Sequence, residues 1–200
     1  MSIDKIEKRK TIHSGGAKGA DSLFSWIGLN YGLDVVTHSF PDHSPTQISK
    51  KSGLVIQYSP SELEYARQFI DVVRNQLNRK PPKNQFVDNL LLRNYYQVSN
   101  SQLVFAISTI VDFENCIVKG GTGYATKLAH NFNIPILIFD QERWEYFCSI
   151  RKSNFFKLKR KPNIFRFPDH FAGIGSRDLN DGVDNEIIEI FKPLIYKSVI

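Results

Sequence analysis

Residues 13–22 read HSGGAKGADS, a stretch with three glycines, one lysine and two serines. A short β-type run, 10–13, leads into it, and apolar residues at helical spacing follow it. Glycine allows positive φ and close approach of the backbone to another group. The first turn of a helix presents N–H groups that favour an anion. The pattern therefore predicts either an ordinary tight connection between strand and helix or a phosphate site.

Two more glycine turns follow strand patterns, KGGTGYAT at 119–126 and GIGSRDLND at 173–181. Ligands of open α/β sheets bind at the carboxyl ends of the strands, so we expect the three turns to face one phosphate-bearing ligand. The expected contacts are Ser14, Gly15, Gly16, Ala17, Lys18, Asp21 and Ser22 in the first turn, Gly120, Gly121, Thr122, Gly123 and Tyr124 in the second, and Gly175, Ser176 and Arg177 in the third.

Three further residues are candidates for contacts to the rest of such a ligand. Asn94 and Tyr95 precede a buried strand, where a tyrosine ring can stack on a base and an amide can bind its edge. The alternative is a helix end with partly exposed tyrosines. Asp140 follows another strand and is either a ribose ligand or a helix N-cap.

The five histidines show no spacing typical of a metal site, so we predict no metal. His38 and His43 lie in or beside a long polar stretch, and we interpret them as surface residues, with ligand contact as the alternative. The five are His13, His38, His43, His130 and His170.

Strand patterns alternate with helical ones along the chain, which predicts a three-layer Rossmann-like α/β fold with a mainly parallel sheet and helices on both faces. Helical patterns follow the first turn up to a stop at Gly32, start at Ser59 or Ser61, run over 84–98 and 124–132, and end the chain with Ile187, Ile190, Phe191, Leu194 and Ile195. The expected strands are 10–13, 33–40, 102–108, 115–118, 134–140 and 171–175. We expect a long surface loop at 41–58, a short helix at 144–150 and an extended edge segment at 155–167.

The chain has 200 residues, of which 42% are hydrophobic and 23% charged, which fits one soluble domain. No apolar run approaches the roughly 20 residues of a membrane span. The polar start of the sequence has no signal-like core, and the two separated cysteines fit a reducing compartment, so we expect a cytoplasmic protein. The net charge of +6 fits either an ordinary basic surface or an anionic partner.

The sequences SGGAKGAD, GGTGYA and GIGSR resemble the signature turns of the SLOG superfamily, which joins SMF/DprA proteins, LOG phosphoribohydrolases and nucleotide-sensing domains. The resemblance covers most of the chain. It implies a Rossmann-like sheet whose glycine turns surround a nucleotide or sugar phosphate, and it implies a homo-oligomer. In those families the GxGSR-type strand comes first, whereas here it comes last, which resembles a circular permutation.

A second departure concerns catalysis. LOG enzymes have a glutamate in PGGxGTxxE that acts on the ribosyl bond, and Lys127 stands at that position here. A cation does not stabilise a developing oxocarbenium ion. We therefore favour a protein that binds a nucleotide-derived molecule, ADP-ribose-like or cyclic, without turning it over and without a required cofactor. It would act as a sensor or as a sequestering protein, including one that a phage directs against host signalling.

Two alternatives remain open. One is an N-glycosidase or phosphoribohydrolase that uses rearranged acids. The other is a protein that binds single-stranded DNA, as SMF/DprA proteins do, through the basic and aromatic segment 151–161. The acids available to the first alternative are Asp21, Glu114, Asp140 and Asp178.

Overall fold

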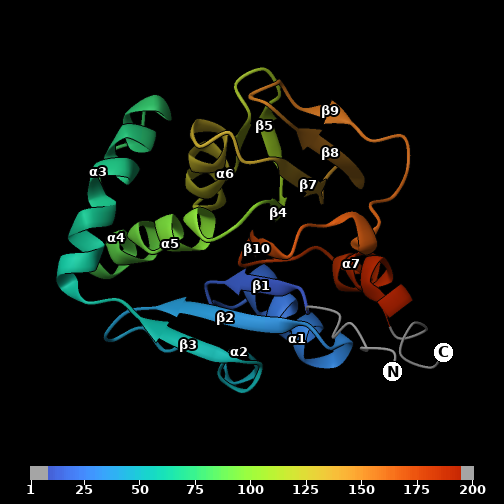
Figure 1. The fold of residues 1–200 in the computed structure, drawn as a ribbon. Helices are drawn as coiled ribbons and strands as arrows, with labels where there is room; N and C mark the ends of the chain where they lie inside the picture. Colours follow the sequence, from blue (N-terminus) through green and yellow to red (C-terminus); the bar gives the residue numbers. More distant parts are fainter. Residues whose placement is uncertain (1–8, 195–200) are drawn as a thin grey trace, which may run out of the picture.

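The strands form one eight-stranded sheet in the order β3-β2-β1-β10-β4-β7-β8-β9, accompanied by a two-stranded hairpin of β5 and β6 (Figure 1). The computed structural model describes residues 9–194 of the chain. Neighbours from β3 to β7 pair in parallel, and β8 and β9 add to the sheet in antiparallel. The fold is therefore α/β with a mainly parallel sheet, as predicted.

The strands are β1 (Thr11–Ser14), β2 (Asp34–Ser39), β3 (Leu54–Gln57), β4 (Val104–Ser108), β5 (Ile110–Asp112), β6 (Ile117–Val118), β7 (Ile136–Asp140), β8 (Glu145–Ser149), β9 (Phe156–Lys157) and β10 (His170–Gly175). The helices are α1 (Ala20–Tyr31), α2 (Gln47–Lys51), α3 (Pro60–Gln76), α4 (Gln85–Leu92), α5 (Asn94–Ser99), α6 (Thr122–Asn131) and α7 (Val183–Phe191), with a 3₁₀ turn at Ile164–Arg166.

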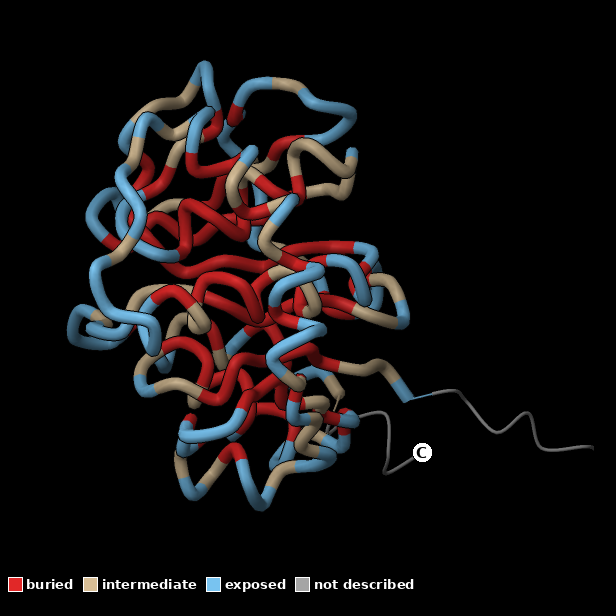
Figure 2. The backbone as a smooth tube through the Cα atoms, turned by 90° about the vertical axis from the view of Figure 1, so that its left-hand side faces the viewer, coloured by how far each residue is buried: buried red, intermediate tan, exposed pale blue. Residues whose placement is uncertain are grey.

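Two hydrophobic cores lie on opposite faces of the sheet, which makes three layers. Alternate residues of each central strand enter one core or the other. In β4, Val104 and Ala106 pack with α3, α4, α5 and α6, whereas Phe105 and Ile107 pack with α1 and α7. Figure 2 shows the buried segments running through the middle of the molecule, with exposed turns around them.

The helix boundaries follow from local signals. Ser59 caps α3, because its hydroxyl oxygen accepts the Glu62 N–H at 3.3 Å while the Glu62 carboxylate accepts the Ser59 N–H at 2.7 Å. Gly32 ends α1 with φ of 71°, a conformation that glycine adopts without penalty. Both helix ends confirm positions expected from the sequence, with Ser59 rather than Ser61 as the cap.

Strand β10 occupies the centre of the sheet although every other strand precedes it in the chain. It pairs with β1 on one side and β4 on the other. From this position the strands β1, β2 and β3 extend in one direction and β4 and β7 in the other. The reversal of strand order at β10 creates a switch point, where the loops at the carboxyl edge diverge and leave room for a ligand.

Three expectations about local structure were wrong. The segment 41–58 is not all loop, because α2 and the edge strand β3 lie within it. The segment 144–150 forms strand β8 rather than a helix, since Tyr146 and Phe147 alternate between the two cores as it pairs with β7. The pattern at 84–98 is two helices that meet at Arg93.

Strand β5 was not expected from the sequence, and the strand expected at 115–118 is reduced to β6. Most other boundaries agree with the sequence to within two residues. The segment 155–167 contributes the edge strand β9, as expected. The apolar stripe of α7 includes buried Ile187, Ile190 and Phe191, whereas the predicted Ile195 lies outside the described residues. Within 9–194, no helix has the length and apolarity required to cross a membrane.

Replacing Gly175 by alanine is expected to destabilise the fold, because a β-carbon there would overlap the main-chain oxygen of Ile107. A backbone atom in the middle of the sheet cannot move aside, so we expect a loss of about 2 kcal/mol in the free energy of unfolding. Gly121→Ala is the control, since its β-carbon would meet only Leu91 Cδ2 at 3.7 Å. Urea unfolding of both variants tests this, and equal stabilities would contradict it.

Candidate functional site

The first turn, 13–22, and the third turn, 173–181, are joined directly at the carboxyl edge of the sheet. The N–H of Ala20 donates to the carbonyl of Ser176 at 3.0 Å. Gly19 has φ of 90°, and a β-carbon on it would overlap the carbonyls of Ser176 and Arg177. Glycine is therefore required at this position by the close approach of the third turn.

The second turn, 119–126, joins the third at the end of β4. Ser176 N–H donates to Ile107 O at 2.8 Å. One residue further on, the Ser108 hydroxyl donates to Lys119 O at 3.4 Å. The end of β4 thus contacts both the second and the third turn, so the three glycine turns lie along the same carboxyl edge of the sheet.

The junction between α4 and α5 lies against two of these turns. The guanidinium of Arg93 occupies the space that a β-carbon on Gly15 would need. Leu91 lies 3.7 Å from the same position on Gly121. The first and second turns are therefore supported by one helical junction, whose Arg93 and Leu91 were not among the contacts expected from the sequence.

Arg93 forms a buried ion pair with Asp21, with 3.3 Å between Nη2 and Oδ2. Both residues are about 95% buried, at 4% exposure each. Arg93 Nη1 also donates to Gln97 Oε1. Three buried atoms around this pair have no hydrogen-bond partner among the described residues, namely Asp21 Oδ1, Arg93 Nε and Gln97 Nε2.

Burial disfavours the charged form of both partners in this pair. It raises the pKa of Asp21 and lowers the pKa of Arg93, while their mutual attraction opposes each shift. The Asp21 carboxylate also accepts the Ala17 N–H at 3.4 Å. Asp21 therefore lies beneath the first turn and orients it.

The first turn is held by hydrogen bonds within itself and by the segment before α2. Ser14 donates to Asp21 O at 3.0 Å, and Ser22 donates to Ala17 O at 2.7 Å. The segment before α2 covers Gly16, whose carbonyl accepts the Thr46 N–H at 2.9 Å. This segment belongs to the stretch expected to cover a site, and it lies over the first turn.

The open part of the surface comes from all three turns. Lys18 and Arg177 are exposed, and no ion pair involving either is found in 9–194. Gly120 and Gly121 at the start of α6 are also exposed, and a β-carbon on Gly120 would meet nothing within 4 Å. Ser176 is half-buried between them. This part combines helix N–H groups with two cations.

The other residues of the second turn are internal. Thr122, Gly123 and Tyr124 are buried. Arg79 contacts this turn at two places. Its Nη1 donates to Gly120 O at 2.7 Å, and its guanidinium carbon lies 5.2 Å from the centre of the Tyr124 ring. The tyrosine hydroxyl expected to contact a ligand thus belongs to a side chain that packs beneath an arginine.

The structure does not bring Asn94, Tyr95 and Asp140 to the open surface. Asn94 is buried, and Tyr95 stacks on Phe69 between α3 and α5, with ring centres 4.6 Å apart. Asp140 is fully buried, and its carboxylate accepts the N–H groups of Ile110, Glu142 and Arg143 at 3.0–3.1 Å. Asp140 caps a turn, the alternative reading of its position.

A line of histidines crosses the sheet beneath α5. Hydrogen bonds join His170 Nδ1 to His13 Nε2 at 3.2 Å, His13 Nδ1 to His38 Nε2 at 2.9 Å, and His38 Nδ1 to the Tyr58 hydroxyl at 2.7 Å. His38 and His43 are buried, at 1% and 9% exposure, so their interpretation as surface residues was wrong. The spacing of the histidines along the sequence does not reveal that their side chains are buried.

Several features that complete the site could not be assigned from the sequence. Arg93 directly follows three leucines, and an arginine at the end of such an apolar run was the available signal. Arg79 follows α3 in a polar stretch that carries no such signal.

Within the described part of the chain, no cluster of three histidine, cysteine or acidic residues is arranged to hold a metal ion. Comparisons with family models, curated proteins and solved structures gave no match.

Replacing Arg93 by methionine is expected to reduce the free energy of unfolding by about 3–5 kcal/mol, because it leaves the Asp21 carboxylate buried without its partner. The double variant R93M/D21N removes both charges, so we expect it to be more stable than R93M. Urea unfolding of the two single variants and the double variant measures this coupling. If the stability loss of the double variant equals the sum of the losses of the two single variants, the two residues are not coupled and the pairing is contradicted.

We expect acid to destabilise the protein already at pH values above the range in which most carboxylates titrate. Burial lowers the pKa of His13 and of His43 from 6.5 to about 4. The unfolded chain therefore binds protons below pH 6.5 that the folded chain does not bind, and stability is lost as pH falls from about 6.5 to about 4.

We expect a loss of roughly 1 kcal/mol or more per histidine between pH 7 and pH 5. His43→Asn keeps a polar atom near Ser39, whose hydroxyl lies 3.0 Å from His43 Nδ1, and removes one titration. The variant should show a shallower decline of urea-unfolding stability over this range. Identical slopes for the variant and the parent protein would refute the assignment.

Proposed function

We propose that the protein binds a phosphate-bearing nucleotide derivative at the switch point without turning it over. The observation that carries this proposal is the union of the three glycine turns through Ser176 and the end of β4. Their resemblance to SLOG turns supports a nucleotide or sugar phosphate as the ligand. On this proposal the protein is a sensor or a sequestering protein.

The chemistry of the open surface supports a phosphate in particular. At the start of α6, Gly120 and Gly121 are exposed, which allows an anion to approach the backbone closely, while the N–H groups of Gly123 and Tyr124 donate to the carbonyls of these two glycines. Arg177 offers a planar fork for two phosphate oxygens, and Lys18 offers a compact positive charge. Neither cation is neutralised by an acidic side chain within the described residues.

Binding without turnover is favoured by the positions of the candidate acids. Asp21 is paired with buried Arg93, and the oxygens of Asp140 accept backbone N–H groups. Lys127, at the position of the LOG glutamate, donates to Asn115 O at 3.3 Å in the loop of the β5–β6 hairpin. Of the four candidate acids, Asp21 and Asp140 are thus already bound by protein groups, whereas Glu114 and Asp178 are exposed.

The direct test is mass spectrometry of small molecules released on denaturation of the purified protein, together with thermal-shift assays using ADP-ribose, ADP and cyclic AMP. A ligand that binds only the native state raises the melting temperature with its concentration. We expect at least one of the three to do so and to be recovered intact. A base or ribose phosphate that accumulates during incubation would instead establish an enzyme.

Arg177→Ala and Lys18→Ala are each expected to weaken binding of the active compound by roughly 10-fold or more, since each removes a charge-assisted contact. Lys159→Ala is the matched control, an exposed cation outside the three turns. Calorimetric titration of the three variants measures the effect. Equal losses in all three, or in none, would place the ligand elsewhere.

A further inference from the structure

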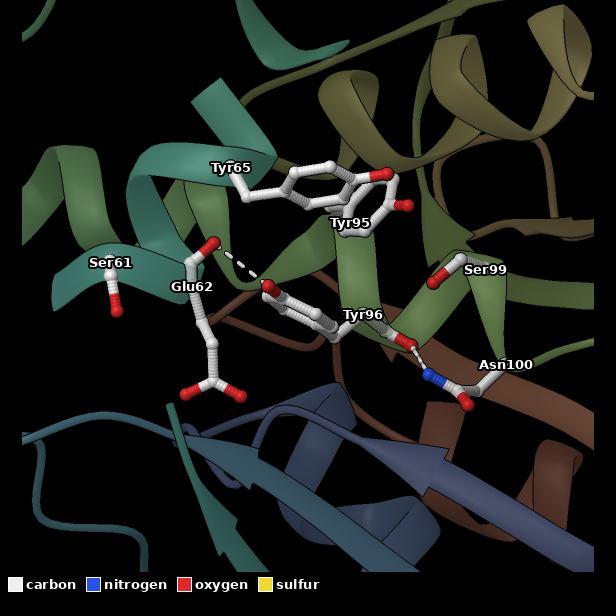
Figure 3. A pocket seen from close by; sticks show the side chains of 7 residues that line it. All are labelled: Ser61, Glu62, Tyr65, Tyr95, Tyr96, Ser99 and Asn100. Carbon is white, nitrogen blue, oxygen red and sulfur yellow. Dashed lines mark hydrogen bonds between the residues drawn. The ribbon is translucent and has the colours of Figure 1, made fainter. Parts of the chain in front are cut away.

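A pocket of about 510 Å³ lies between α3 and α5, and none of the described residues of the three glycine turns lines it. Figure 3 shows Tyr65 and Tyr95 beside each other and Tyr96 below them, with Glu62 on one side and Ser99 and Asn100 on the other. We call it the aromatic pocket. Its lining residues are Ser61, Glu62 and Tyr65 from α3, and Tyr95, Tyr96, Ser99 and Asn100 from α5.

The rings of the aromatic pocket are held in fixed orientations by rings behind them. Tyr96 stacks on Tyr58 with centres 3.7 Å apart, and Tyr95 stacks on Phe69 at 4.6 Å. Tyr65 meets Tyr95 edge-on at 74°, and Tyr95 meets Tyr96 at 83°. The pocket is therefore bounded by aromatic walls at steep angles to one another, rather than by one flat patch.

Glu62 is the one charged side chain among the lining residues in the described part of the chain. The backbone N–H and the hydroxyl of Ser59 both donate to its carboxylate at 2.7 Å, and these bonds hold the pKa of Glu62 below its usual range. Burial raises the pKa of Tyr95 to about 12, so its hydroxyl stays neutral. At neutral pH the pocket therefore carries a single negative charge.

Two donors of the pocket are already used within the protein. Tyr96 already donates its hydroxyl hydrogen to Glu62 O at 2.7 Å, and Asn100 donates its amide to Tyr96 O at 2.8 Å. The side-chain oxygen of Asn100 and the carboxylate of Glu62 remain as acceptors. A ligand that suits these groups donates several hydrogen bonds and is positively charged.

We propose that the aromatic pocket binds a guanidinium group. A planar cation is attracted by the negative faces of tyrosine rings, and stacking on them leaves its N–H groups free to bond at its edges. Glu62 supplies the opposite charge and Asn100 an acceptor. A phosphate would meet a carboxylate and no cation here, so this site is chemically opposite to the surface formed by the glycine turns. The inference does not depend on the function proposed for that surface.

The test is a titration followed by two-dimensional NMR, with agmatine as a free guanidinium compound and acetyl-Gly-Arg-Gly-amide as an arginine within a peptide. We expect amide shifts confined to the start of α3 and to α5 with its C-cap Asn100, with at least one of the two compounds. Tighter binding of the peptide would assign the source to a protein partner, and tighter binding of agmatine to a small molecule. Tetramethylammonium and AMP are the comparison compounds.

Tyr65→Ala and Glu62→Gln are each expected to weaken guanidinium binding by about 10-fold or more, corresponding to about 1.4 kcal/mol. Tyr65 is 54% exposed, so its truncation leaves the fold intact. Glu64→Gln and Val72→Ala are matched controls on exposed positions of α3 outside the pocket. The proposal is overturned if neither guanidinium compound binds, if tetramethylammonium or AMP binds as tightly, or if the controls weaken binding as much.

Discussion

The ion pair between Arg93 and Asp21 is the interaction on which the carboxyl edge of the sheet depends. It joins α1 to the junction of α4 and α5 and places a guanidinium in the space beneath Gly15. Desolvating two charges is costly, and the attraction between them compensates only when the geometry is maintained. The pair therefore makes the first turn sensitive to the helices on one face of the sheet, whereas α1 itself packs on the other face.

The fold class could be predicted because strand and helix patterns are local and alternate cleanly along the chain. The central strands, most helices and the capping of α3 follow from such patterns. Strand β8 could not be predicted, since its apolar residues fit both a short helix and a strand, and only pairing with β7 decides between them. The division of 84–98 into two helices at Arg93 could not be predicted either, because Arg93 contacts Gly15, which lies 78 positions earlier in the sequence.

The candidate site was predictable in outline and not in detail. The first and third turns are in direct contact and the second contacts the end of β4, because parallel strands bring their carboxyl ends to one edge. Which members of each turn stay open depends on what packs beside them. Arg79 covers Tyr124 and the segment with Thr46 covers Gly16, and neither contact has a counterpart in local sequence. The histidine line beneath α5 likewise arises from the register of β10, β1 and β2. His13 lies opposite Ala172 and Val36, and His170 and His38 are each two residues from these partners, on the same face of the sheet.

The central place of β10 also has a consequence for the order in which the molecule can assemble. Thr11 pairs with His170, so the middle of the sheet joins segments that are almost the whole described chain apart. Contacts between residues so far apart in sequence form slowly during folding, because closing a long loop costs chain entropy before the contact is made. While the chain emerges from a ribosome, β1 and β4 have no strand between them, and the turns cannot meet. The arrangement of turns proposed to bind a nucleotide derivative is therefore absent from every nascent chain that lacks β10.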